Sequence, residues 1–255
     1  MNIKRYFFFG LPFDDIDRID LIDYILNNVD RPFEYVVTPN VDHVVRLYQR
    51  SDLKGAYYNA FFSVCDSNIL RLLFKIKKYP CMELITGSDL TADILNMSHN
   101  IKLSITIIGG SDMAVEILRD LYPGCIFKHL NPSMGFINNP IEIEDAVSFV
   151  CSSASQLTLF CVGSPQQELL AKKVYESKSA KGVGLCVGAS VDFITGQSSR
   201  APVIFRRIGF EWLYRLATNP VKLWRRYLLM GPKIFIIAMR SSRDTALNFE
   251  SRKIE

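Results

Sequence analysis

Short apolar runs alternate with amphipathic segments over the first 195 residues of the chain. The runs are rich in β-branched and aromatic residues and are followed by polar or glycine-containing turns, a pattern typical of buried strands. They predict strands over residues 5–9, 34–38, 61–64, 104–108, 125–129, 157–162 and 182–187. Apolar residues at helical spacing predict helices over residues 15–28, 112–121, 140–151 and 166–177, and a capping box predicts a helix start at Thr86. This alternation predicts an α/β fold, with a mostly parallel sheet covered by helices on both faces.

The chain changes character after about residue 196. The segment RAPVIFRRIGFEWLYRLATNPVKLWRRYLLMGPKIFIIAMRSSRD lacks strand-like alternation and predicts two or three helices, broken at Pro220 and Pro232. We therefore expect two domains, a core over residues 1–195 and a helical appendage over residues 196–255.

Composition excludes several classes of protein. With 49% hydrophobic and 22% charged residues, the chain is not intrinsically disordered. Its apolar runs are far shorter than the about 20 residues of a membrane-spanning helix, so we expect no such helix. The six cysteines contain no C-x-x-C pair and the three histidines lack ligand spacing, which indicates buried thiols rather than disulfides or a metal site.

Charge is distributed unevenly along the chain. Residues 200–243 contain ten basic side chains against Glu211 alone, a net charge of +9, which leaves −5 for the rest of a chain whose total is +4. This segment could be a solvated basic face, a nucleic-acid-binding surface or a membrane-binding surface. Because apolar residues dominate RRYLLMGPKIFIIAMRSSR and basic residues bracket them, we favour an anionic membrane over nucleic acid.

Small and polar residues follow five of the predicted strands. In open parallel sheets ligands bind beyond the carboxyl ends of the strands, so these residues define the candidate site. They are Thr38 and Asn40, Asp66, Gly109-Gly110-Ser111, Gln167 in GSPQQE, and the Gly188–Ser190 turn.

Each of these positions has an alternative interpretation. Asp66 directly follows a buried strand and could act as a general base with a raised pKa, or it could simply cap the next helix. Thr38 and Asn40 carry the same ambiguity. Gly109-Gly110-Ser111 could bind a phosphate at a helix N-terminus, or could be only a tight turn.

The sequence offers no cofactor or metal motif. The glycine turn matches neither G-x-G-x-x-G nor a Walker A sequence. The only Asp-x-Asp, Asp15-Ile-Asp17, opens a predicted helix, where acidic residues are common for electrostatic reasons. We therefore expect no bound metal and no cofactor.

Several motifs together resemble a known family. They are VVTPNVDHV, the strand end at Asp66, LITGSDL, GGSD, GSPQQE and VGASVDFITGQSSRAPVIFRRIGFEWLYRLATNPVKLWRRYL. Over about residues 3–230 the chain resembles the WecG/TagA/CpsF glycosyltransferases (family 26), and VTPNVDHV also resembles the GumM-like branch, which builds exopolysaccharides.

The resemblance implies a Rossmann-like core and a bacterial enzyme that inverts the anomeric centre. It would transfer a sugar from a UDP-sugar to a polyprenyl-diphosphate-linked saccharide, peripherally at the cytoplasmic face of the cell membrane. It would need no metal, and its appendage would bind the membrane and complete the active site with arginines.

The resemblance also implies roles for residues that match the family's motifs by position. Asp66 matches the proposed general base, Thr38 a substrate-contacting threonine with Asn40 beside it, and Gln167 the glutamine of G-x-P-x-Q-E. The arginines that would stabilise the diphosphate are Arg215, Arg225 and Arg226. The chain departs from the family in two places: Ser67 replaces the usual glycine after the aspartate, and Gln166 replaces the usual lysine.

We therefore predict an inverting, metal-independent transferase of a hexose or N-acetylmannosamine-type sugar, with Gly109, Gly110 and Ser111 holding the diphosphate. The expected partners are the UDP-sugar, the lipid-linked glycan and an anionic membrane surface, but no nucleic acid. Self-association through the apolar tail is also open. The rival functions are a nucleotide-binding oxidoreductase and a nucleic-acid-binding protein. The sequence does not specify the sugar, the acceptor or the pathway.

Overall fold

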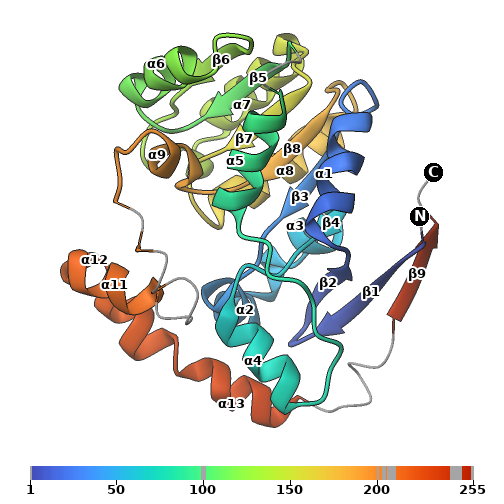
Figure 1. Ribbon diagram of the computed structural model, residues 1–255, viewed down its shortest axis with the longest axis vertical. Helices are drawn as coiled ribbons and strands as arrows, with labels where there is room; N and C mark the ends of the chain where they lie inside the picture. Colours follow the sequence, from blue (N-terminus) through green and yellow to red (C-terminus); the bar gives the residue numbers. More distant parts are fainter. Residues whose placement is uncertain are drawn as a thin grey trace.

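A six-stranded, entirely parallel sheet forms the centre of the protein (Figure 1). The computed structural model describes residues 2–98, 102–199, 201–202, 205, 211–241 and 249–253. The strand order is β4-β3-β8-β7-β5-β6. The strands are β3 (Glu34–Val37), β4 (Phe62–Ser63), β5 (Ser104–Ile108), β6 (Ile126–Leu130), β7 (Leu157–Phe160) and β8 (Val183–Cys186). The predicted Rossmann-like α/β class is confirmed.

Helices cover both faces of this sheet, and successive side chains of each strand enter opposite layers. In β3, Tyr35 and Val37 belong to the same buried cluster as residues of α2, α3, α7 and α8. Val36, between them, joins α1, α5, α6 and α9 in a second cluster. Alternation of this kind buries the inner strands on both faces, which explains their nearly continuous apolar runs, whereas the edge strand β6 leaves Ile126 59% exposed. The core helices are α1 (Arg18–Asn27), α2 (Val41–Gln49), α3 (Gly55–Tyr58), α4 (Asn68–Ile76), α5 (Gly87–Met97), α6 (Asp112–Leu121), α7 (Pro140–Ser153), α8 (Gln166–Ser177) and α9 (Ser190–Ile194), with 3₁₀ turns η1 (Ser51–Leu53) and η3 (Phe136–Asn138).

A separate antiparallel sheet has the order β2-β1-β9. It contains β1 (Asn2–Phe8), β2 (Leu11–Asp15) and β9 (Phe249–Lys253). The predicted strand over residues 5–9 lies here and not in the parallel sheet. Phe9 and Gly10 both adopt positive φ, 54° and 77°, as the two-residue hairpin between β1 and β2 requires. The helix predicted from residue 15 begins instead at Arg18, because Asp17 accepts a hydrogen bond from the backbone N–H of Asp20 and caps it.

The C-terminal segment contains α11 (Glu211–Thr218), α12 (Pro220–Trp224), the π-helical turn η4 (Arg225–Met230) and α13 (Lys233–Arg240). The predicted breaks are confirmed, since α12 begins at Pro220 and Pro232 immediately precedes α13. β9 was not predicted. Ile234 and Ile237 of α13 are buried in the cluster that holds α2, and β9 pairs with β1, so this segment is joined to the core at two places (Figure 1). The division at residue 195 stays a prediction. Within the described ranges no helix is long and apolar enough to cross a bilayer.

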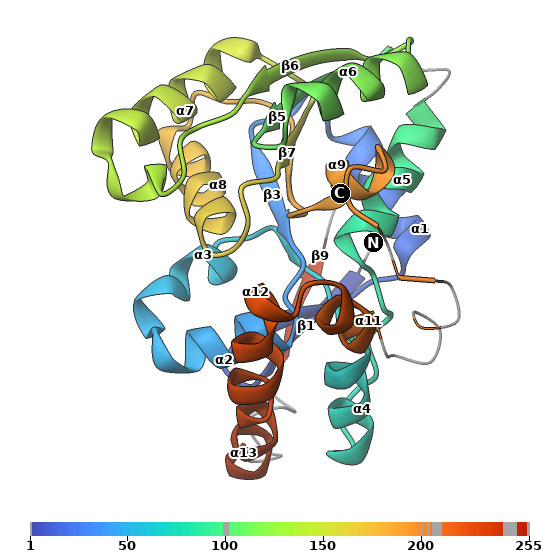
Figure 2. The same ribbon diagram turned by 90° about the vertical axis from the view of Figure 1, so that its left-hand side faces the viewer.

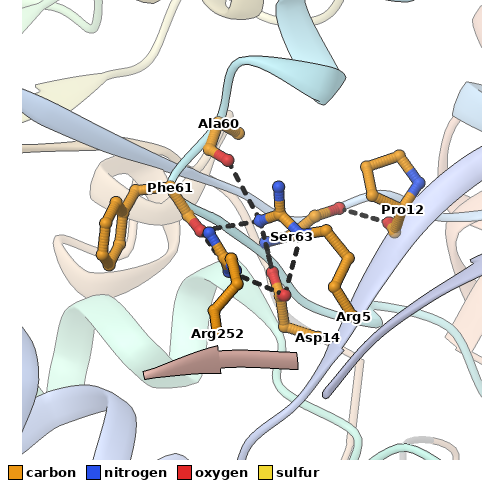
Figure 3. Close-up of polar contacts among 7 residues, drawn as sticks. All are labelled: Arg5, Pro12, Asp14, Ala60, Phe61, Ser63 and Arg252. Carbon is orange, nitrogen blue, oxygen red and sulfur yellow. Dashed lines mark hydrogen bonds and ion pairs between the residues drawn. The ribbon is translucent and has the colours of Figure 1, made fainter. Parts of the chain in front are cut away.

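A buried ion cluster joins the two sheets (Figure 3). The carboxylate of Asp14 accepts two hydrogen bonds from Arg5, at 2.9 and 2.7 Å, one from Arg252 of β9 at 2.9 Å, and one from the backbone N–H of Ser63 in β4 at 2.7 Å. Both arginines also donate to the carbonyl of Phe61. The N-terminal hairpin and the last strand are thereby attached to the edge of the parallel sheet.

Candidate active site

The loops after β3 and β4 meet at the carboxyl edge of the sheet. The backbone N–H of Asp66 donates to the carbonyl of Pro39 at 3.1 Å, which places Asp66 beside the Thr38–Asn40 loop. The hydroxyl of Thr38 is buried and donates to the carbonyl of Cys186, at the end of β8, over 3.1 Å. Three strand ends are therefore fixed to one another where a ligand is expected to bind.

The structure separates the two interpretations of Asp66. Helix α4 is capped by Ser67, whose hydroxyl accepts from the backbone N–H of Leu70 at 3.3 Å. Asp66 is half-buried and is not the cap. Asn40, in contrast, caps α2 by accepting from the N–H of Asp42 at 3.0 Å. The simple capping interpretation therefore describes Asn40 and not Asp66.

The Gly109-Gly110-Ser111 turn connects β5 to α6. Both glycines have positive φ, 90° and 79°. A Cβ on Gly109 would lie 2.9 Å from the carbonyl carbon of Cys161, so the close approach of the β5 and β7 loops also requires glycine there. Ser111 caps α6 through the N–H of Ala114, at 3.2 Å. The turn thus has a structural role, and phosphate binding by it stays a prediction.

Gln167 connects two further strand ends. It is 3% exposed; its Oε1 accepts from the N–H of Gly188 at 2.9 Å, and its Nε2 donates to Glu168 at 2.8 Å. The buried amide thus fixes the start of α8 to the turn after β8. Contact of Gln167 with a substrate stays a prediction. The structure shows that Gln167 also holds the turn after β8 in place.

Two polar groups near this edge were not singled out from the sequence. Arg46 of α2 pairs with Asp42 and donates to the hydroxyl of Ser164 at 2.8 Å, so it joins the loops after β3 and β7. The i, i+4 spacing of Asp42 and Arg46 on a helix is a detectable signal for the ion pair, though not for the contact with Ser164. Asp192 of α9 follows β8, and partial burial raises the pKa of its carboxyl.

The appendage arginines are only partly placed. Arg225 is exposed, and its guanidinium lies over the ring of Trp224, 5.4 Å from the centroid. The side chains of Arg215 and Arg226 lie outside the described part of the structure, although their backbones lie in α11 and η4. Participation of these three arginines in the site stays a prediction.

Metal-ligating side chains form no cluster in the described ranges. No group of three or more His, Cys, Asp or Glu residues there could hold a metal ion. Asp17 of the Asp-x-Asp caps α1, as its electrostatic interpretation predicts, whereas Asp15 ends β2 and does not open the helix as predicted. The requirement for a metal is left to experiment.

Comparison with known proteins decides the family. The family model described as "Glycosyl transferase WecG/TagA/CpsF family" matches residues 6–247, nearly the whole chain. The chain belongs to this family. It is also 26% identical over 246 residues to the N-acetylglucosaminyldiphosphoundecaprenol N-acetyl-beta-D-mannosaminyltransferase of Bacillus spizizenii, and the alignment covers 91% of this chain and 92% of that protein.

The WecG/TagA/CpsF assignment confirms the resemblance and identifies the protein as a glycosyltransferase. Sugar transfer needs a group that accepts a proton from the attacking hydroxyl and groups that stabilise the departing diphosphate. Asp66 and the Gly109–Ser111 turn, which both follow strands at this edge, are the residues predicted for these two tasks. The roles of these residues stay predictions.

Glu168 provides a test of this edge that depends on pH. Its carboxyl is fully buried, and burial raises its pKa above the usual 4.5, while the hydrogen bond from Gln167 opposes part of the rise. A folded-state pKa above the unfolded one favours folding at low pH, and this contribution is lost as pH rises through the folded value. We expect the unfolding free energy of the wild type to fall, relative to that of Glu168→Gln, as pH rises from below 4.5 to neutral.

Urea unfolding at a series of pH values measures this difference, because groups common to both proteins cancel. Glu176→Gln is the matched control: this glutamate lies on the same helix, is half exposed and pairs with Lys172. Its substitution should produce no comparable divergence. Parallel pH profiles for wild type and Glu168→Gln would show that the buried carboxyl does not titrate differently in the folded state.

Proposed function

We propose that this glycosyltransferase moves a hexose or N-acetylmannosamine-type sugar from a UDP-sugar to a polyprenyl-diphosphate-linked saccharide, with inversion and without a metal, in bacterial cell-surface polysaccharide synthesis. The observation that carries the mechanism is the position of Asp66. It follows a buried strand, lies against the Thr38–Asn40 loop, and is not the cap of the helix that follows. The Bacillus spizizenii relative, named for transfer to a lipid-linked saccharide, supports the choice of acceptor class.

In this proposal Asp66 accepts the proton of the acceptor hydroxyl as the oxygen attacks the anomeric carbon in line with the leaving group. The new glycosidic bond forms as the bond to the diphosphate breaks, and UDP leaves with the electron pair. Backbone N–H groups at Gly109–Ser111 would stabilise the developing charge. Arg215, Arg225 and Arg226 would supply further positive charge.

The charge distribution supports peripheral attachment at the cytoplasmic face of the membrane, where the lipid-linked acceptor is anchored. The basic segment at residues 200–243 carries +9 against −5 elsewhere, and anionic lipid attracts such segments by about 1 kcal/mol per basic residue. The catalytic body and the membrane-binding part would then be different parts of one chain.

The first experiment is transfer from a panel of radiolabelled UDP-sugars to membrane-extracted lipid-linked saccharide in the presence of EDTA. We expect one sugar to be transferred despite chelation. Transfer that appears only when a divalent cation is restored would contradict metal independence alone. If no UDP-sugar served as donor to a folded protein supplied with native acceptor, the proposed reaction would be wrong.

A further inference from the structure

Helix α4, which belongs to the core, has a face that nothing in the described structure covers. Leu72 and Ile76 lie one helical turn apart and are 55% and 64% exposed, although the same helix buries Leu73 and Phe74 on its other side. The lysines Lys75, Lys77 and Lys78 flank this apolar pair. Large apolar side chains grouped beside cations in this way are typical of a binding surface.

Helix α13 presents a matching face at the same end of the protein. Phe235, Ile236 and Met239 are exposed, and Arg240 ends the helix. Figures 1 and 2 show α4 and α13 side by side at this end, away from the parallel sheet. The hydroxyl of Tyr79, just after α4, donates to that of Ser241, just after α13, at 3.4 Å. The two helices therefore end beside each other, and each has exposed apolar side chains at this end of the protein.

The charge of this surface identifies its occupant. Neither α4 nor α13 contains an acidic residue, and in the described ranges the three lysines form no ion pair. Two exposed apolar helix faces whose helices carry basic but no acidic side chains are complementary to an anionic lipid surface, where apolar side chains enter the acyl boundary and cations remain among the headgroups.

We propose that α4 and α13 together form one docking surface for an anionic bilayer, so that the core contacts the membrane directly and not only through its C-terminal segment. The proposal extends the membrane attachment suggested above, which involved residues 196–255 alone. Lipid binding by this surface can be measured without any sugar transfer. Only the effect of this binding on access of the acceptor to Asp66 rests on the proposed function.

The consequence concerns the distance between the bilayer and the candidate base. Helix α4 begins at Asn68, two residues after Asp66, and its nine residues rise about 13 Å at ~1.5 Å per residue. With Leu72 and Ile76 at the headgroup layer, Asp66 would lie above the membrane by no more than about the length of this short helix. An acceptor whose diphosphate and first sugar project from the bilayer would then reach Asp66 while its lipid chain remains inserted.

The test is cosedimentation of the full chain with vesicles of phosphatidylethanolamine and phosphatidylglycerol, compared with vesicles of phosphatidylcholine. Wild type should bind the anionic vesicles and bind phosphatidylcholine weakly. Lys75→Gln/Lys77→Gln/Lys78→Gln should weaken binding to anionic vesicles about a hundredfold. Leu72→Ser/Ile76→Ser should weaken it about tenfold. The conservative Lys75→Arg/Lys77→Arg/Lys78→Arg should bind like the wild type.

The matched control is Met113→Ser/Ile141→Ser, which removes two equally exposed apolar side chains from α6 and α7 at the opposite end of the core (Figure 1). It should leave vesicle binding unchanged. All variants should retain transfer to a short-chain acceptor in detergent solution, since none of these residues lies among the strand-end loops.

Two results would overturn the proposal: α4 variants that bind anionic vesicles as tightly as the wild type, or wild type that binds phosphatidylcholine equally well. A change from dimer to monomer in the α4 variants, with vesicle binding unchanged, would assign the surface to a second copy of the chain instead. Failure of wild type to transfer any sugar would contradict the proposed function while leaving the vesicle result decisive for this surface.

Discussion

Replacing Asp66 with asparagine should reduce the turnover number about 10²- to 10⁴-fold, the usual contribution of a general base. Asparagine has nearly the shape of aspartate but cannot accept the proton of the acceptor hydroxyl. Because Ser67, and not Asp66, caps α4, the substitution should leave the unfolding free energy nearly unchanged. Steady-state kinetics with the donor identified by the UDP-sugar panel, together with urea unfolding, measure both quantities.

The neighbouring residue provides the control. Ser67→Ala removes the cap of α4 and should cost about 1 kcal/mol of stability while leaving turnover near that of the wild type. The two variants therefore separate catalysis from capping at adjacent positions. If Asp66→Asn instead had a lower unfolding free energy and a normal turnover number, the role of Asp66 would be structural and not catalytic.

Much of the fold could be predicted because the parallel strands are buried on both faces. Runs such as residues 104–108 and 157–162 are mostly apolar, and their threonines Thr106 and Thr158 are buried as well, so the apolar content of the runs identified β5 and β7. β4 was found through the apolar run at 61–64, although its ladder contains only Phe62 and Ser63. Helices α6 and α8 begin and end at the predicted residues; Ser111 caps α6, whereas α8 follows Pro165 without a side-chain cap.

The antiparallel sheet was predicted only in part: the apolar run at residues 5–9 identified β1, but the pairing of β1 with β9 depends on contacts far apart in sequence. β9 has the sequence FESRK, which carries no apolar alternation, and it is a strand because β1 offers an edge and Asp14 offers a partner for Arg252. β2, LPFDD, was assigned in part to the following helix, since nothing local distinguishes its buried Asp14 from its exposed Asp15.

For the candidate site, too, contacts between residues far apart in sequence could not be predicted. Parallel strand order predicts that Thr38, Asp66, Gly109 and Gln167 reach one edge, and the structure places their loops there. Strand order alone does not predict which of these loops contact one another. The contacts of Pro39 with Asp66, and of Gln167 with Gly188, depend on loop conformations that form only when the neighbouring strands are assembled.

Asp14→Asn should cost about 3–5 kcal/mol of unfolding free energy, the effect of removing one partner from a buried ion pair. The Asp14 side chain is fully buried, and among the described residues it accepts hydrogen bonds from N–H donors of Arg5, Arg252 and Ser63. An asparagine amide would turn an NH₂ group toward these donors and leave two guanidinium groups without a counter-charge. Urea unfolding followed by circular dichroism measures the loss.

Asp15→Asn is the control, since Asp15 is the next residue of the same strand and is exposed. Its cost should be within about 0.5 kcal/mol. Arg252→Ala should cost less than Asp14→Asn, because Arg252 is partly exposed and Arg5 still neutralises the carboxylate. The double variant should lose less unfolding free energy than the sum of the two single losses, because both substitutions remove the same contact between β9 and the hairpin. Equal losses for Asp14→Asn and Asp15→Asn would mean that the ion cluster contributes nothing to holding the two sheets together.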